Sequence, residues 1–218
     1  MELSEIVVKE WAKGWSLDGW KKRWESVLCN AYETADNVVK DESLAPNSAG
    51  STALVLIVSP CQIIAANCGD FRAILCRGAQ AIPLTIDHKP DRAYEMEMIT
   101  TNRGKILYWG CSRVEGILSV SMAIGDHNLK TWIVSTPEVT FTARTEEDVC
   151  LVLARDGLWD VLSNGEVAKL ARTELRRRRK LGASSPADYV SRKIVKKALM
   201  ANTEDNISII VIDFNKYF

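Results

Sequence analysis

The sequence predicts an α+β fold in which packed antiparallel sheets are flanked by helices. Three observations lead to this prediction: a helical pattern at the start, a series of short apolar runs separated by turn residues, and two well-marked helices before a last apolar run. Strands first, then helices, then one more strand is the order expected when helices cover antiparallel sheets.

The first part of the chain is predicted to be helical. From Glu2 to about Val39, apolar residues recur mostly three, four and five positions apart. They are Trp11, Trp15, Trp20, Trp24, Val27, Leu28 and Ala31. Such a tryptophan stripe is typical of a helix face that packs into a core. Asp41 to Gly50 is rich in turn residues and is predicted to be a loop, so residues 1–49 form a helical region and loop ahead of a strand-rich part at residues 50–218.

The middle of the chain is predicted to be an antiparallel meander. Its short apolar runs are separated by Ser59-Pro60, Gly69-Asp70 and Arg77-Gly78, which are turn pairs. The predicted strands are 53–58, 63–67, 72–76, 79–84, 105–109, about 117–120, 139–143 and 149–154. A short helix is predicted at Asp87 to about Thr101, with Pro90 near its first turn.

Two later helices have clear start signals. Ser163-Asn164-Gly165-Glu166 fits a capping box, in which the serine oxygen and the glutamate side chain each accept a backbone N–H. Ser185-Pro186-Ala187-Asp188 combines a serine cap, a proline in the first turn and an acid nearby. Ile207–Phe214 is predicted to be the last strand.

Composition excludes several classes of protein. The chain has 28 basic and 28 acidic residues, so its formal net charge of zero argues against a general nucleic-acid binder. No apolar run approaches the roughly 18 residues of a membrane span, and the start does not resemble a secretory signal. The 6 cysteines include no C-x-x-C pair, so they are interpreted as small core residues in a reducing compartment.

Four aspartates stand at the ends of predicted strands: Asp70, Asp126, Asp156 and Asp205. A carboxylate just past a buried strand is rigidly held and can point into a cleft. Converging carboxylates repel one another unless a cation lies between them, and hard ions such as Mg²⁺ and Mn²⁺ prefer such oxygen ligands. Two such ions can activate water and hold a phosphoryl group for in-line attack. Each aspartate taken alone would be interpreted as an ordinary turn residue.

Six motifs, taken together, resemble the type 2C family of metal-dependent protein phosphatases. They are Gly50-Ser51-Thr52-Ala53 (GSTA), Asn67 to Ala73 (NxGDSRA), Asp87-His88-Lys89-Pro90 (DHKP), Ala123 to Asp126 (the end of SRAIGD), Asp156 to Asp160 (DGLWD) and Asp205 to Ser208 (DNIS). They occur in the family's order and cover about Gly50 to the end of the chain. The resemblance implies the type 2C phosphatase fold.

The resemblance also implies a metal site. In the family, aspartates at the positions of Asp156 and Asp205 hold two catalytic Mg²⁺ or Mn²⁺ ions, and those at Asp70 and Asp126 are associated with a weaker third ion. The chain is most similar to the plant abscisic-acid co-receptor phosphatases, because Lys105 to Trp109 resembles their tryptophan-lock segment. There a tryptophan at the position of Trp109 inserts into the hormone-bound receptor. Alternatively, Trp109 is an ordinary strand aromatic.

The sequence departs from the family pattern at its start. The family's phosphate-gripping arginine and its DGHGG motif, with the proposed general-acid histidine, are not found, and Asp18-Gly19 does not match them. The interpretation is an amino-terminally truncated domain, with no catalytic residue assigned. An absent general acid typically costs ~10²–10⁴-fold in rate.

Single substitutions also depart from the pattern. Phe71 replaces a serine, Met122 an arginine, and Cys111 and Arg103 replace glycines of the lock region. Arg155 stands where the family has threonine or serine, so it places a cation beside a metal-binding carboxylate and could compete with the ion.

The predicted function is hydrolysis of phosphoserine and phosphothreonine in phosphoproteins such as kinases, in abscisic-acid signalling and with Mg²⁺ or Mn²⁺. One alternative is a catalytically dead pseudophosphatase that binds a hormone receptor or a kinase, and another is a remnant without a stable fold. No nucleic-acid or membrane partner is expected. The expected location is cytoplasmic, nuclear or both: the basic run Arg176 to Lys180 is either a nuclear address or the solvated end of a helix.

Overall fold

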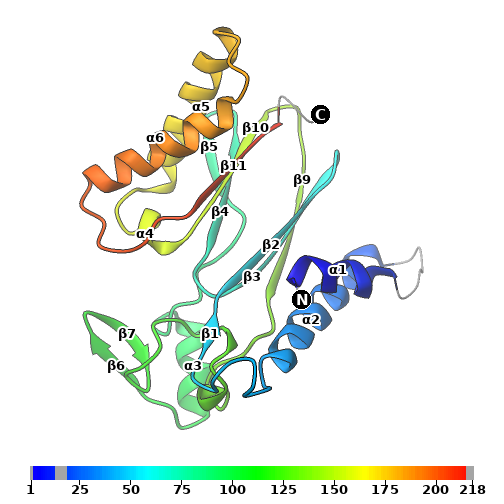
Figure 1. Ribbon diagram of the computed structural model, residues 1–218, viewed down its shortest axis with the longest axis vertical. Coiled ribbons are helices and arrows are strands. Elements are labelled where there is room, and N and C mark those ends of the chain that lie inside the picture. The colour runs from blue at the N-terminus through cyan, green and yellow to red at the C-terminus, as the bar shows by residue number, and fades with distance from the viewer. Residues whose placement is uncertain (1, 13–18, 215–218) are drawn as a thin grey trace. The chain divides into compact units, whose positions relative to one another are not determined.

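The structure is a computed structural model that describes residues 2–12 and 19–214 (Figure 1). The chain divides into two compact units, which are described separately. The first contains the chain up to Ile57, Ile64–Asp70 and Asp87–Phe141. The second contains Val58–Ile63, Phe71–Ile86 and the chain from Thr142 onward.

The predicted helical start is confirmed as two helices, α1 (Leu3–Ala12) and α2 (Trp20–Val38). They pack against each other, and the buried face of α2 includes Leu28 and Tyr32. Trp15 and the side chain of Trp11 lie outside the described residues.

The rest of the tryptophan stripe is less buried than predicted. Trp24 is only partly buried beside the core, and Trp20 is exposed. Trp20 makes an edge-on contact with the ring of Phe141, with the ring centroids 5.4 Å apart. The core contact of α2 is therefore made mainly by its smaller apolar residues and by Tyr32.

Short strands carry the next motifs. One antiparallel pair consists of β1 (Gly50–Ser51) and β8 (Ile124–Gly125). A three-stranded sheet in the order β2-β3-β9 consists of β2 (Ala53–Val58), β3 (Gln62–Cys68) and β9 (Glu138–Ala143). The prediction of β-strands at 53–58, 63–67 and 139–143 is therefore confirmed.

Two predictions in the first unit are wrong in detail. The helix α3 (Ala93–Thr101) begins after Pro90, because Asp87 to Arg92 forms an extended segment and a turn. The strand expected at 117–120 is instead β7 (Cys111–Val114), which pairs with β6 (Ile106–Trp109) as an antiparallel hairpin. Glu115 and Gly116 both have positive φ and end that strand.

The second unit contains a four-stranded sheet in the order β11-β10-β4-β5 (Figure 1). Its strands are β4 (Arg72–Arg77), β5 (Gln80–Pro83), β10 (Asp148–Ala154) and β11 (Ile209–Asp213), and all its pairings are antiparallel. The predicted strands exist, and the predicted meander is confirmed where β2 neighbours β3 and where β4 pairs with β5, but it is wrong between β3 and β4. Strands β3 and β4 belong to different sheets, and β4 pairs with β10, which lies far along the chain.

Helices α5 (Asn164–Lys180) and α6 (Pro186–Met200) pack against this sheet and against each other. The predicted capping box of Ser163 and Glu166 is present with both of its hydrogen bonds. Ser185 does occupy the N-cap position of α6, but its side chain makes no capping hydrogen bond, so that part of the prediction is wrong.

The predicted fold class, α+β with antiparallel sheets and helices, is confirmed. All six cysteines are free: Cys68, Cys76 and Cys150 are buried as predicted, Cys29 is half-buried, and Cys61 and Cys111 are exposed. Among the described residues, no helix combines the length and apolar character needed to cross a membrane.

Candidate metal site

Asp156 stands where a buried strand turns into a helix. Strand β10 ends at Ala154, and Asp156 is the first residue of the short helix α4 (Asp156–Trp159). The carboxylate oxygen Oδ1 accepts the N–H of Gly157 at 3.0 Å. The indole of Trp159 donates to the carbonyl of Ala154 at 2.9 Å, which fixes the helix to the strand that precedes it.

Asp205 is brought close to this helix by tight backbone packing. It lies just before β11, and the β10–β11 register pairs Ala154 with Ile209. The hydroxyl of Thr203 donates to the carbonyl of Gly157 at 2.7 Å. A Cβ atom at Gly157 would lie only 2.5 Å from the carbonyl oxygen of Asn206, so this glycine permits the close approach.

Arg155 lies close to both carboxylates. Its Nη2 atom lies 4.0 Å from Oδ1 of Asp156 and 3.8 Å from Oδ2 of Asp205. At these separations the contacts are ion pairs and not hydrogen bonds. The prediction that Arg155 places a cation beside the carboxylate of Asp156 is therefore confirmed. The guanidinium also lies near the carboxylate of Asp205.

Asp70 lies in the first unit and is already neutralised. Its carboxylate is buried and pairs with the ammonium of Lys89 at 2.5 Å. His88 supports the same turn, because its Nδ1 atom accepts the N–H of Gly69 at 3.1 Å and its Nε2 atom lies 3.2 Å from Glu138. The DHKP motif thus positions the turn that carries Asp70.

Asp126, also in the first unit, follows β8 in a left-handed conformation with φ of 50°. Burial raises the pKa of its carboxyl group, while Lys130 and His127 oppose this effect. A Cβ at Gly50 would lie 1.8 Å from Oδ2 of Asp126, so the glycine of the GSTA motif leaves the space that this carboxylate fills.

Asp36 was not predicted from the sequence to have a role near the site. This buried acid on α2 accepts the N–H of Gly125 at 2.8 Å and pairs with Lys130 at 2.7 Å, so it holds the turn before Asp126 in place. The signal was available: Asp36 lies four positions after Tyr32, on the helix face that is otherwise apolar.

The pair Asp156 and Asp205 fits a divalent cation in its donor chemistry. Both supply carboxylate oxygens, which Mg²⁺ and Mn²⁺ prefer, and both lie within 4.0 Å of one atom, Nη2 of Arg155. Within residues 2–12 and 19–214, no three acidic, histidine or cysteine side chains gather so as to hold a metal ion. Asp70 and Asp126 belong to the other unit, so the four-aspartate site stays a prediction.

Trp109 is placed where a partner could reach it. It is the last residue of β6, next to Gly110 at the tip of the hairpin, and 72% of its surface is exposed. Tyr108 and Leu107 on the same strand are also exposed. The side chain therefore does not serve as a core residue of the sheet.

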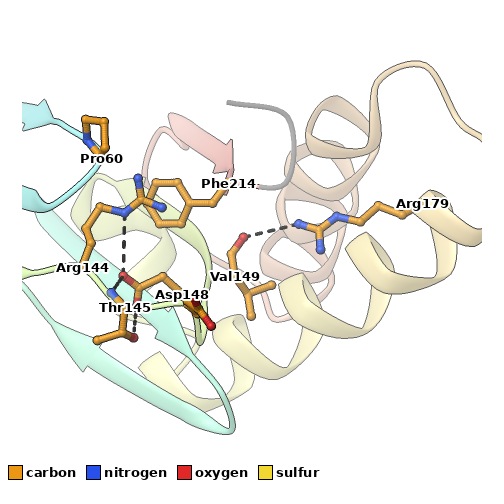
Figure 2. Close-up of a pocket in the computed structure, with 8 residues that line it drawn as sticks. Pro60, Arg144, Thr145, Asp148, Val149, Arg179 and Phe214 are labelled. Atoms are coloured by element: carbon orange, nitrogen blue, oxygen red, sulfur yellow. Dashed lines mark hydrogen bonds and ion pairs between the residues drawn. The ribbon is translucent and has the colours of Figure 1, made fainter. Parts of the chain in front are cut away.

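A separate pocket of about 550 Å³ lies in the second unit (Figure 2). None of the four predicted metal ligands lines it. Arg144 reaches the carbonyl of Ser59 at 3.2 Å and lies over the ring of Phe214, and Arg179 pairs with Asp213. Both cations of the pocket are thus already engaged with the protein.

Comparison with known proteins assigns the family. The model of the family described as protein phosphatase 2C matches residues 11–207. The chain belongs to the protein phosphatase 2C family. A probable protein phosphatase 2C of rice (Oryza sativa subsp. japonica) is 40% identical over 215 residues, which cover 90% of this chain and 46% of that protein.

Other relatives agree with this assignment. Protein phosphatase 2C 77 of Arabidopsis thaliana is 39% identical over 233 residues, covering 98% of this chain and 54% of that protein. The chain thus spans about half the length of the curated 2C phosphatases that it matches. A crystal structure of a serine-threonine phosphatase 2C from Toxoplasma gondii shares the fold, with a TM-score of 0.78, 22% identity and coverage of 97% of this chain and 79% of that one.

Proposed function

We propose that this protein phosphatase 2C chain takes part in the Mg²⁺- or Mn²⁺-dependent hydrolysis of phosphoserine and phosphothreonine in proteins. The observation that carries the proposal is the approach of Asp156 and Asp205 to the same guanidinium nitrogen, at 4.0 and 3.8 Å. These acids come from separate motifs, and a fold that brings them together satisfies the first requirement of a carboxylate metal site.

The chain's own residues would orient the metal ligands. The N–H of Gly157 holds Oδ1 of Asp156, and the N–H of Asn206 holds Oδ1 of Asp205 at 2.6 Å. Each of these hydrogen bonds restrains one oxygen of its carboxylate, and the carboxylate oxygens would serve as the metal ligands. A bound divalent cation would supply charge neutralisation for the phosphoryl group and an acidified water molecule. Asp70 and Asp126 are proposed for a weaker third ion, for which Asp70 would have to release Lys89.

Hydrolysis of a phosphothreonine peptide in the presence of Mn²⁺ tests this proposal. We expect activity that EDTA removes and that Asp156→Ala lowers by at least ~10²-fold, because the ion loses a ligand at the site of charge development. Asp188→Ala is a matched control, since this aspartate is exposed on α6 and forms an ion pair with Arg192. Metal-independent turnover, or equal activity of the two variants, would contradict the proposal.

A second candidate function is partner binding with little or no catalysis, and the exposure of Trp109 favours it. The segment resembles the lock of the abscisic-acid co-receptor phosphatases, so the proposed partner is a hormone receptor, and kinases are proposed as substrates or partners. Exposed aromatic anchors are frequent binding hot spots. A hormone-dependent pull-down with the receptor should succeed with the native chain and with Tyr108→Ala, and fail with Trp109→Ala. Failure of the native chain to associate, with or without hormone, would exclude this role.

The proposed location is cytoplasmic, nuclear or both. The basic run of α5 supports this only weakly, because Arg179 within it pairs with Asp213 and Arg178 lies over the ring of Tyr189. Imaging of a fluorescent fusion would test it, and an extracellular signal would contradict it.

A further inference from the structure

We propose that Arg155 is a built-in counter-ion for Asp156 and Asp205 that lowers the affinity of this pair for a divalent cation. The inference rests on the proposed function, because it concerns the same two acids. It adds a regulatory property: metal binding requires the Arg155 side chain to move away from the two carboxylates.

The geometry shows why one guanidinium can serve both acids. Arg155 is the N-cap residue of α4, directly before Asp156, and its N–H donates to the carbonyl of Ser208 at 3.3 Å. The backbone of Arg155 is thus tied to the segment that carries Asp205. From this position its Nη2 atom approaches one oxygen of each acid.

The chemistry makes this cation a permanent competitor. A guanidinium stays protonated throughout the physiological range, so pH cannot remove its charge. It brings one positive charge to two carboxylates, whereas a divalent ion brings two positive charges and is also coordinated directly by oxygen atoms. The two cations need the same space and repel each other when both are near.

The contacts are weak enough for exchange. Both exceed hydrogen-bond length, and the exposed fractions of the side chains are 39% for Arg155, 22% for Asp156 and 43% for Asp205. Repulsion by a unit charge about 4 Å away lowers the binding constant of a cation by a factor of about five in water and by several hundred at a partly buried site. Because the three side chains are this exposed to solvent, the effect should lie near the lower of these two factors. We therefore expect Arg155 to weaken metal binding by about tenfold.

Calorimetric titration of the full chain with Mn²⁺ tests the inference without measuring activity. Arg155→Thr should tighten Mn²⁺ binding by about tenfold relative to the native chain. Arg192→Thr, which removes an equally charged, exposed side chain that pairs with Asp188 and with neither of these acids among the described ion pairs, should leave the affinity unchanged within twofold. Adding Asp205→Asn to Arg155→Thr should abolish the gain, which shows that the new affinity belongs to this pair of acids.

The outcomes separate this inference from the proposed function. Equal Mn²⁺ affinity of the native chain and Arg155→Thr overturns the inference, whether both bind or neither does. If both bind equally and hydrolyse the phosphopeptide, the proposed function stands and only the inference fails. If Arg155→Thr binds tenfold more tightly but neither protein hydrolyses the phosphopeptide, the inference stands and the proposed function fails.

Discussion

Gly157→Ala tests whether close backbone packing holds the two acids together. The added methyl group would lie 2.5 Å from the carbonyl oxygen of Asn206 and 3.3 Å from the carbonyl carbon of Asp205. The first distance is shorter than real Cβ contacts allow. The obstructing atoms belong to the backbone, so no side-chain rotation can relieve the contact. The loop before β11 must move away from α4.

The size of the effect follows from overpacking. Forcing a methyl group into a well-packed region typically costs about 1–3 kcal/mol in the free energy of unfolding. The φ angle of Gly157 is not in the positive region that favours glycine, so the cost is steric. Because the displaced loop carries Asp205, we also expect the Mn²⁺ affinity to fall.

Urea unfolding followed by circular dichroism measures the first effect, and Mn²⁺ titration measures the second. Gly165→Ala is the matched control, because a Cβ there meets nothing within 4 Å and the position lies in helix α5. Alanine should be neutral there or stabilise the helix by up to ~1 kcal/mol. A Gly157→Ala protein as stable as the native chain, with unchanged metal affinity, would refute the argument from close packing.

Two further predictions concern helices α5 and α6. Ser163→Ala should lower the free energy of unfolding by about 1 kcal/mol, because it breaks the capping box with Glu166. Ser185→Ala should lower it less, because that side chain makes no capping hydrogen bond. Urea unfolding of the two variants measures both losses, and equal losses would contradict this reasoning. The hydrogen bond from Lys193 at 2.6 Å lowers the pKa of Glu174, so the ionised acid stabilises the fold at neutral pH and this contribution disappears as pH falls through the lowered pKa. Glu174→Gln should therefore be less stable than the native chain by about 1 kcal/mol at pH 7 and equally stable in acid, and a pH-independent difference would contradict the assignment.

Local signals in the sequence predicted local structure well. Turn pairs such as Arg77-Gly78 marked the ends of strands, and the capping box at Ser163 marked the start of α5, because these signals act over a few residues. The approach of Arg155 to Asp156 was also predictable, since the two are neighbours in the chain.

Partners far apart in the chain could not be predicted from these signals. The apolar run of β4 could pair equally well with β3, as a meander predicts, or with β10. Only the three-dimensional arrangement selects β10. The contact of Arg155 with Asp205 depends on the β10–β11 register. The role of Asp36 required knowing that α2 packs close to β8. The strand expected at 117–120 failed because a positive φ at Glu115 is not evident from residue type.

The pairing of β10 with β11 has a consequence for protein synthesis. Asp156 leaves the ribosome well before Asp205, because the segment that forms helices α5 and α6 lies between them in the chain. Domains fold as units during translation, and the two acids come together only after β11 has joined the sheet. Until then Asp156, its neighbour in the chain, is the one of these two acids that Arg155 can meet, so the proposed metal site can form only after β11 has been synthesised.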